Sequence, residues 1–365
     1  MNNDYIYGLL LTQQFRFCGN AFRADTYRGC SFKCRYCFSN IRMLDNSKGK
    51  NNQITKADFK TFTKAFNSID YKTEEKGVFG KLNQELLTHR VPIHLGGLSD
   101  PFQPVEFEEK NTYNFLQLFK SYPVVISTKT SHLPNEYFNI IDPKFKTFQI
   151  SLFTDNEETL RIFEPNTPTF KERIDFILEL KKRGFWVSVR IQPIIYIDEA
   201  ISLINKLKDI VDFITVEHLK IPPTKEGKDL IKLIDMERLD YILKLRRSYL
   251  KLPFDKILKN IKSIKDIYNG NLGVGDNELL TETTSCNCCG LDCMPNEFNN
   301  WLKYNYLNIA KTGHKNHWIP KNGIKTGIIN KLDNNIRDIK HYVDSYCLDV
   351  YKLNEVNLFN SFEKT

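Results

Sequence analysis

Three cysteines stand close together in the sequence TYRGCSFKCRYCF. Cys30, Cys34 and Cys37 have the spacing C-x3-C-x2-C. Three thiolates on one short loop can bind three irons of a cubane iron–sulfur cluster, which leaves the fourth iron without a protein ligand. A structural zinc site needs four ligands, usually in two pairs, and Cys18 is poorly spaced to be the fourth. The spacing therefore favours a 4Fe–4S cluster with one open iron.

A second group of cysteines lies in TSCNCCGLDC, with the spacing C-x-C-C-x3-C. It consists of Cys286, Cys288, Cys289 and Cys293. Dense cysteine groups in a reducing compartment indicate metal sites rather than disulfides. Adjacent cysteines do not easily bind one ion together, so three of the four would be ligands. Three interpretations stay open: a second iron–sulfur cluster, a structural zinc ion, and free thiols for redox chemistry or hydrogen-atom donation.

Six short, mostly apolar runs predict the β-strands that would position these cysteines. They lie at residues 26–29, 92–96, 124–128, 148–153, 186–192 and 213–217. Apolar runs bounded by polar residues, Gly or Pro are typical of parallel strands buried on both faces. Between them lie amphipathic segments, most clearly residues 170–183 with Gly184 as the C-cap. The alternation predicts an α/β fold, a partial (β/α)6 TIM-type barrel with its active face at the C-terminal strand ends.

The character of the chain changes after residue 220. Helical patterns at 236–250 and 254–268 precede a short apolar run at 272–274, the second cysteine group and an Asn- and Lys-rich tail. An apolar stripe within residues 328–343 indicates a helix in that tail. We expect two regions: a barrel core, residues 1–220, and a mainly helical C-terminal extension, residues 221–365, with the cysteine-rich loop 286–293. If 272–274 is a late strand, this loop would lie near the active face.

The first cysteine motif, with Tyr36 as its aromatic residue, resembles the signature C-x3-C-x-aromatic-C of the radical S-adenosylmethionine (radical SAM) superfamily. The segments YRGC, GGLSDPFQPVE, ISTKTS, FQISLFT, FEPNTP and VSVRIQPII follow in order at the expected strand ends. Together they resemble the spore photoproduct lyase-like branch over roughly residues 22–200. The resemblance implies a 4Fe–4S cluster whose open iron binds S-adenosylmethionine, and reductive cleavage of that cofactor to a 5′-deoxyadenosyl radical.

The resemblance also implies cofactor contacts at Tyr36, Gly96, Gly97 and Ser151, and the positions of Lys129, Arg190 and Gln192 on or after predicted strands add these three as candidates. The tyrosine would pack beside the adenine, the two glycines would approach the methionine amino group, and the serine would contact the ribose. The Lys129 ammonium would meet the carboxylate. Arg190 and Gln192 alternate along one predicted strand and so point to one face, although the arginine could instead form a structural ion pair.

The charge balance is modestly positive, with 52 Lys and Arg against 44 Asp and Glu, a formal net charge of +8. Such a balance favours anionic partners such as DNA or RNA, or simply gives a solvated basic surface. No run of about 18 apolar residues predicts a membrane span. The first residues lack the pattern of a secretory signal, so we expect a cytoplasmic protein without membrane partners.

Three classes of function fit these observations. The first is a radical SAM enzyme of lyase or transferase type that abstracts hydrogen from a nucleic acid or nucleotide, in repair or modification. The second is a peptide- or protein-modifying radical SAM enzyme with an auxiliary iron–sulfur cluster. The third is a non-catalytic metal-binding module that binds nucleic acid. Either enzyme would need S-adenosylmethionine and an external electron donor.

Overall fold

The computed structural model describes twelve stretches of the chain: residues 8–12, 20, 22–39, 54–70, 83–84, 86–222, 224–239, 243–246, 249–275, 289–299, 306–312 and 315–320. Four cysteines and the stripe expected at 328–343 lie outside them: Cys18, Cys286, Cys288 and Cys347. Among the helices of the described stretches, none has both the length and the apolar character that crossing a membrane requires.

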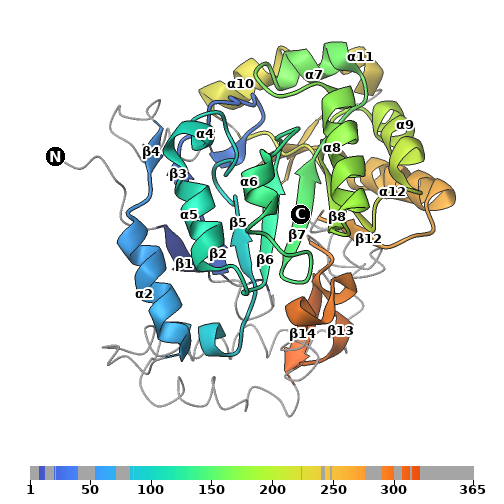
Figure 1. The fold of residues 1–365 in the computed structure, drawn as a ribbon. Coiled ribbons are helices and arrows are strands. Elements are labelled where there is room, and N and C mark those ends of the chain that lie inside the picture. The colour runs from blue at the N-terminus through green and yellow to red at the C-terminus, as the bar shows by residue number, and fades with distance from the viewer. Residues whose placement is uncertain are drawn as a thin grey trace.

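An eight-stranded sheet forms the centre of the fold, in the order β1-β2-β5-β6-β7-β8-β9-β12 (Figure 1). Its strands are β1 (Leu9–Leu11), β2 (Phe22–Ala24), β5 (Ile93–Leu95), β6 (Val124–Thr128), β7 (Lys146–Ser151), β8 (Trp186–Ile194), β9 (Phe213–His218) and β12 (Leu272–Val274). Neighbouring strands from β2 to β12 are parallel, and only the edge strand β1 is antiparallel to its neighbour. The sheet is therefore the predicted open, partial barrel of α/β type.

Six further strands form three small antiparallel pairs outside this sheet. The pairs are β3 (Tyr27–Arg28) with β4 (Thr55–Lys56), β10 (Lys244–Arg246) with β11 (Tyr249–Lys251), and β13 (Tyr306–Thr312) with β14 (Lys315–Pro320). The described part of the C-terminal extension thus contains hairpins as well as helices.

The helices follow the strands along the chain, and several lie across one side of the sheet (Figure 1). They are α2 (Phe59–Asp70), α4 (Glu106–Glu109), α5 (Asn111–Leu118), α6 (Asn135–Phe138), α7 (Glu157–Phe163), α8 (Phe170–Lys182), α9 (Ile197–Leu207), α10 (Lys225–Ile231), α11 (Met236–Leu239) and α12 (Phe254–Ile267), with the 3-10 turn η3 (Leu291–Cys293). Helix α8 confirms the clearest sequence pattern. It begins with a capping box between Thr169 and Glu172, and Gly184 follows it at a φ of 83°.

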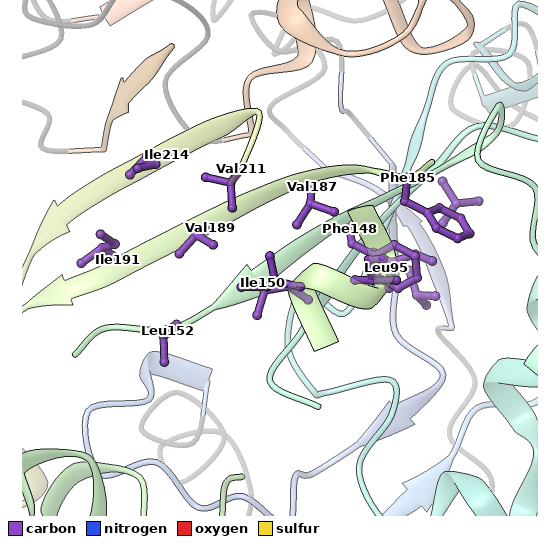
Figure 2. Close-up of a cluster of buried hydrophobic side chains, with 14 of the residues drawn as sticks. Leu95, Phe148, Ile150, Leu152, Phe185, Val187, Val189, Ile191, Val211 and Ile214 are labelled. Carbon is purple, nitrogen blue, oxygen red and sulfur yellow. The ribbon is translucent and has the colours of Figure 1, made fainter. Parts of the chain in front are cut away.

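The outer face of the sheet carries the main hydrophobic core. Phe148, Ile150, Val187, Val189 and Ile191 are fully buried and alternate along β7 and β8 (Figure 2). Side chains of α5, α8, α9 and α12 belong to the same core. Burying each of these large side chains contributes about 1.5–3 kcal/mol to folding. Because strand side chains alternate between faces, the residues between them point into the barrel, and most of those are polar.

The position of the first strand differs from the sequence prediction. The first strand of the barrel is β2, four residues before the predicted 26–29, because Phe22–Ala24 pairs with Ile93–Leu95. Tyr27 and Arg28 pair with β4 instead. The run at 272–274 is indeed a late strand, parallel to β9. The sheet therefore continues past residue 220, and the two-region division stays a prediction.

Candidate functional site

The first three cysteines lie on the loop that follows β3, beyond the C-terminal end of β2. Cys34 is buried, whereas Cys30 and Cys37 are half-buried. The backbone N–H of Cys37 donates to the carbonyl of Cys34 at 3.1 Å, which turns the loop back on itself. Burial raises the pKa of Cys30 to about 12, and the nearby charges of Asp100 and Cys37 add to this rise. The loop therefore carries its three thiols on one turn, with Cys34 and Cys37 joined through their backbones.

The donor set of this loop suits a cubane cluster. Within the described stretches, no three His, Cys, Asp or Glu side chains converge as the ligands of a single metal ion do. A cubane does not need such convergence, because each thiolate binds a different iron. The buried hydroxyl oxygen of Ser31, next to Cys30, also has no hydrogen-bond partner in the described residues. An unpaired polar atom beside three thiols is available to the group that they bind.

The segment that follows β5 holds the cysteine loop from one side. The backbone N–H of Ser31 donates to Gln103 Oε1 at 2.9 Å, and Gln103 Nε2 donates to the carbonyl of Gly29 at 3.1 Å. Near the end of the loop, Ser39 Oγ donates to the carbonyl of Leu98 at 2.7 Å. These bonds fix the loop at both ends of the cysteine motif.

Asp100 ties that segment to the end of β6. Its carboxylate accepts hydrogen bonds from the backbone N–H of Lys129 at 2.6 Å and from Thr128 Oγ1 at 2.8 Å. It also accepts from the backbone N–H of Phe102 at 2.9 Å, as an aspartate in a turn does. Asp100, which begins this turn before Pro101, therefore also fixes the backbone at Lys129.

The segment that follows α7 holds the cysteine loop from the other side. The backbone N–H of Arg35 donates to the carbonyl of Phe163 at 2.9 Å, and Asn166 Nδ2 donates to the carbonyl of Ser31 at 3.0 Å. This segment is the FEPNTP motif of the sequence. The motif thus holds the cysteine loop in place through these two hydrogen bonds.

Glu164 of this motif is fully buried and gathers four polar side chains. It forms ion pairs with Lys129 and Arg173, each at 2.6 Å. The hydroxyl of Tyr36 also donates to it, and Thr167 Oγ1 donates to it at 3.1 Å. Burial alone would raise the pKa of Glu164, but the Arg173 guanidinium and the Lys129 ammonium lower it to about 2. Glu164 is therefore an anion at neutral pH.

A row of hydrogen-bonded polar side chains crosses the inner face of five strands. Its members are His94, Ser127, Gln149, Arg190, Gln192, Glu217 and Lys220. We call this set the interior polar row. It begins where His94 Nε2 and Ser127 Oγ lie 2.7 Å apart, and Ser127 Oγ donates to Gln149 Oε1 at 2.9 Å.

The row continues through β8 to β9. Arg190 Nη1 donates to Gln149 Oε1 at 3.2 Å, and Arg190 Nε donates to Gln192 Oε1 at 2.8 Å. Gln192 Nε2 donates to Glu217 Oε2 at 3.0 Å, and Glu217 pairs with Lys220. The members from Arg190 onward are half-buried, so they keep some access to solvent inside the barrel. Arg190 and Gln192 of β8 thus point to the same face of the sheet, as their alternation predicts.

The structure brings some of the predicted cofactor residues together. Lys129 Nζ donates to Tyr36 Oη at 3.1 Å, beside the cysteine loop. Ser151 ends β7 and accepts a hydrogen bond from Arg173 at its carbonyl, 2.9 Å away. Arg190 lies deeper, in the interior polar row. Their contacts with the cofactor remain predictions.

Gly96 and Gly97 are needed for contacts within the protein. Gly96 has a φ of 90°, and a Cβ there would overlap the carbonyl oxygen of Ser127 and the ring of Pro101. A Cβ at Gly97 would overlap the side chain of Arg23. The positive φ and the close backbone approach explain Gly96 without a ligand, and the close approach of the Arg23 side chain favours glycine at position 97. Their predicted contact with the methionine amino group stays a prediction.

The described cysteines of the second group lie in the segment 289–299, which packs at the opposite end of the barrel. Cys289 is buried in a small apolar cluster with Val125 and Trp186, near the N-terminal ends of β6 and β8. A Cβ at Gly290 would overlap the ring of Phe213, which begins β9. The expectation that this loop lies near the active face is therefore wrong for Cys289 and Cys293, because residues 289–299 bury their apolar side chains against the barrel base. Their metal binding stays a prediction, since half of the group lies outside the described residues.

Several residues of the site were missed from sequence. Arg173 falls on the apolar face of α8, four residues before Ile177, and a charge on such a face signals a buried ion pair. Glu164 belongs to the FEPNTP motif but had no assigned role. Gln149 and Glu217 sit on strands with the same alternation as Arg190, which was a usable signal.

Comparisons with known proteins find similarity over much of the barrel. Residues 25–201 match the radical SAM superfamily. An uncharacterised protein of Methanocaldococcus jannaschii is 23% identical over 253 residues, covering 68% of this chain and 88% of that protein. A mutant of spore photoproduct lyase has a similar structure, with a TM-score of 0.50 at 13% identity over 72% of this chain and 80% of that one. A double mutant of the lyase with bound AdoMet and dinucleoside spore photoproduct has the same values. These structures share the fold of the described residues.

Proposed function

Because the chain belongs to the radical SAM superfamily, we propose that it uses Cys30, Cys34 and Cys37 to hold a 4Fe–4S cluster and cleaves S-adenosylmethionine reductively there. The family implies both cofactors. The observation that carries the proposal is the placement of the three thiols at the C-terminal end of the barrel, next to Tyr36 and Lys129. In barrels of this kind the C-terminal strand ends form the active face.

The chemistry of the bound cofactors is one-electron cleavage of the sulfonium C–S bond, which yields a 5′-deoxyadenosyl radical able to abstract hydrogen from a substrate carbon. The protein's own residues bind and orient. Tyr36 offers a ring beside the cysteine loop, and its edge meets Phe153 at a centroid distance of 5.4 Å. Lys129 offers a cation for a carboxylate. The interior polar row offers donors and acceptors on the inner face of the barrel strands.

For the substrate we propose a nucleic acid or nucleotide. The net charge of +8 favours an anionic partner. Spore photoproduct lyase, which has a similar fold, binds a dinucleoside photoproduct. The alternative of a peptide substrate depends on an auxiliary cluster, and the described Cys289 is buried in an apolar cluster at the N-terminal ends of the strands, away from the first three cysteines. The nucleic-acid proposal is therefore the better supported of the two.

The cleavage reaction can be tested on anaerobically reconstituted protein. With dithionite as reductant, we expect S-adenosylmethionine to yield 5′-deoxyadenosine and methionine. The Cys30→Ala/Cys34→Ala/Cys37→Ala triple variant should form neither, whereas Cys293→Ser should retain the reaction. A wild-type protein that binds iron but never cleaves the cofactor would contradict the proposal, and so would an active triple variant.

The substrate class can be tested separately by binding. Affinity for DNA or RNA that falls steeply with salt concentration supports phosphate contacts, because neutralised phosphates release counterions. Retained cleavage of S-adenosylmethionine without any nucleic-acid affinity at low salt would overturn only the substrate proposal. Hydrogen abstraction from a peptide would then take its place.

A further inference from the structure

The buried carboxylate of Glu164 joins four separate parts of the fold. Tyr36 comes from the cysteine loop, Lys129 follows β6, and Arg173 belongs to α8, while Glu164 itself follows α7. The side chains of Glu164 and Arg173 have no exposed surface, and that of Lys129 is 16% exposed. We call these residues the Glu164 hub.

The two oxygens of Glu164 face different surroundings. Oε2 accepts from Arg173 Nη2 at 2.6 Å and from Thr167 Oγ1 at 3.1 Å. Arg173 is itself fixed, because its guanidinium also donates to the carbonyls of Pro168 at 3.1 Å and Ser151 at 2.9 Å. Oε2 is therefore held by the scaffold.

The other oxygen faces the candidate site. Oε1 accepts from Lys129 Nζ at 2.6 Å and from the hydroxyl of Tyr36. Lys129 Nζ also donates to Tyr36 Oη at 3.1 Å, which closes a triangle of three polar groups. An ammonium has three N–H donors, so these two bonds leave one for a ligand. The rotamers of both side chains are thus fixed before any cofactor binds.

We propose that Glu164 is a positioning residue, which transmits the rigid geometry of Arg173 to Tyr36 and Lys129 and so sets their orientation toward S-adenosylmethionine. This inference rests on the proposed function, since it concerns the same site. Glu164 does not touch the cofactor in this account. It acts through the two side chains that would, as a group that locks the rotamers of a binding site does.

The test is a comparison of Glu164→Gln with wild type, in which the dissociation constant for S-adenosylmethionine is measured on the anaerobically reconstituted protein. The change in the electron paramagnetic resonance signal of the reduced cluster reports binding without turnover. We expect affinity to fall by about tenfold or more, because a charge-assisted bond that orients the binding group is lost. Glu199→Gln is the matched control. That carboxylate is also buried, and it accepts from Thr154 at 2.5 Å and Thr159 at 2.8 Å.

A merely structural role would give a different result. Both variants would then lose thermal stability and both would keep the wild-type affinity for S-adenosylmethionine, which overturns the inference. A double-mutant cycle with Lys129→Met sharpens the test. If Glu164 acts through Lys129, adding Glu164→Gln to Lys129→Met should weaken binding far less than it does alone. Fully additive effects would also overturn it.

Glu164→Gln leaves two buried cations without their anion and therefore carries a risk of misfolding. Tyr36→Phe is the second variant, since it removes one donor from Oε1 and leaves both ion pairs in place. It should weaken binding by about three- to tenfold. Unchanged affinity in this variant would overturn the inference. A wild-type protein without affinity for S-adenosylmethionine would instead refute the proposed function itself, so the two failures are distinguishable.

Discussion

The two ends of the barrel have opposite chemistry. At the C-terminal end, Glu164, Lys129 and Tyr36 form a charged, hydrogen-bonded group beside three cysteines. At the N-terminal end, residues 289–299 cover the barrel with an apolar cluster that includes Val125 and Trp186. The same strands serve both ends. The difference shows that a side chain near the C-terminal end of a strand belongs to the candidate site, whereas one near the N-terminal end of the same strand stabilises the fold.

Replacing one cysteine by alanine at each end of the barrel should give the largest difference in activity between two variants. Cys34→Ala removes a ligand from the proposed cluster, so we expect formation of 5′-deoxyadenosine to fall below detection. Cys289→Ala removes a buried thiol that is 3% exposed at the base, and it should lower only the melting temperature. Iron content and product formation, measured on both variants, check this. Loss of activity in Cys289→Ala with unchanged stability would break the contrast.

Truncating the base should affect stability alone. Phe298 is 1% exposed in the apolar cluster, and its replacement by Ala should cost about 3–5 kcal/mol of unfolding free energy. Chemical denaturation measures this cost. The dissociation constant for S-adenosylmethionine should stay at its wild-type value, provided that it is measured well below the melting temperature. A change in affinity without a change in stability would show that the base takes part in the site.

A buried lysine at the start of β7 makes stability depend on pH. Lys146 Nζ donates to the carbonyls of Phe119, Lys120 and Tyr122 at 2.9 to 3.0 Å. Burial lowers its pKa to about 7 from the usual 10.5. The unfolded chain then binds more protons than the folded one between these values, so stability should rise with pH from about 7 to about 10.

The variant Lys146→Met removes this titration. The difference in unfolding free energy between wild type and Lys146→Met, followed from pH 6 to pH 10, isolates the contribution of the lysine. We expect the unfolding free energy of wild type to increase relative to that of the variant as the pH rises. A flat difference, or one that falls, would contradict the lowered pKa.

The smallest expected difference is between substitutions at two positions of the same strand, β7. Thr147 and Gln149 are two residues apart on the inner face of β7, one at the base and one in the interior polar row. Thr147→Val removes a weak bond to Met294 Sδ at 3.7 Å and should change stability by less than about 1 kcal/mol. Gln149→Leu leaves Ser127 and Arg190 without a shared acceptor and should cost about 1–3 kcal/mol.

Denaturant titrations and product assays on both variants measure this contrast. Gln149→Leu should also slow turnover of the substrate, because Arg190 loses one of the bonds that orient it. If the two substitutions changed stability and turnover equally, the interior polar row would have no role in the site.

Much of the fold could be predicted from local sequence. The strands from β5 to β9 fall within two residues of the predicted runs, because buried parallel strands are continuous and apolar. Helix α8 carries its own start and stop signals in Thr169 and Gly184. The first strand was misplaced, because three residues at Phe22–Ala24 give too weak a pattern. The cysteine loop was recognised because its ligands are neighbours in sequence.

The Glu164 hub could not be predicted in the same way. Tyr36 and Glu164 are 128 residues apart, and their contact depends on how β2, β6 and α8 assemble. The predicted location of the second cysteine group was wrong for the same reason. The sequence shows that Leu291 and Phe298 are apolar, but only the packed barrel shows that they cover its base. Local patterns specify elements and ligand spacing, whereas contacts between distant segments need the assembled fold.

The central claim is that S-adenosylmethionine binds the one iron that Cys30, Cys34 and Cys37 leave open. Electron–nuclear double resonance on the reduced, anaerobically reconstituted protein tests it directly, with S-adenosylmethionine labelled with 15N at its amino group. The account predicts a hyperfine coupling between the cluster and that nitrogen, absent in the cysteine triple variant. A reduced cluster that shows no coupling to the labelled cofactor at saturating concentration, or a loop that holds only zinc, would contradict it.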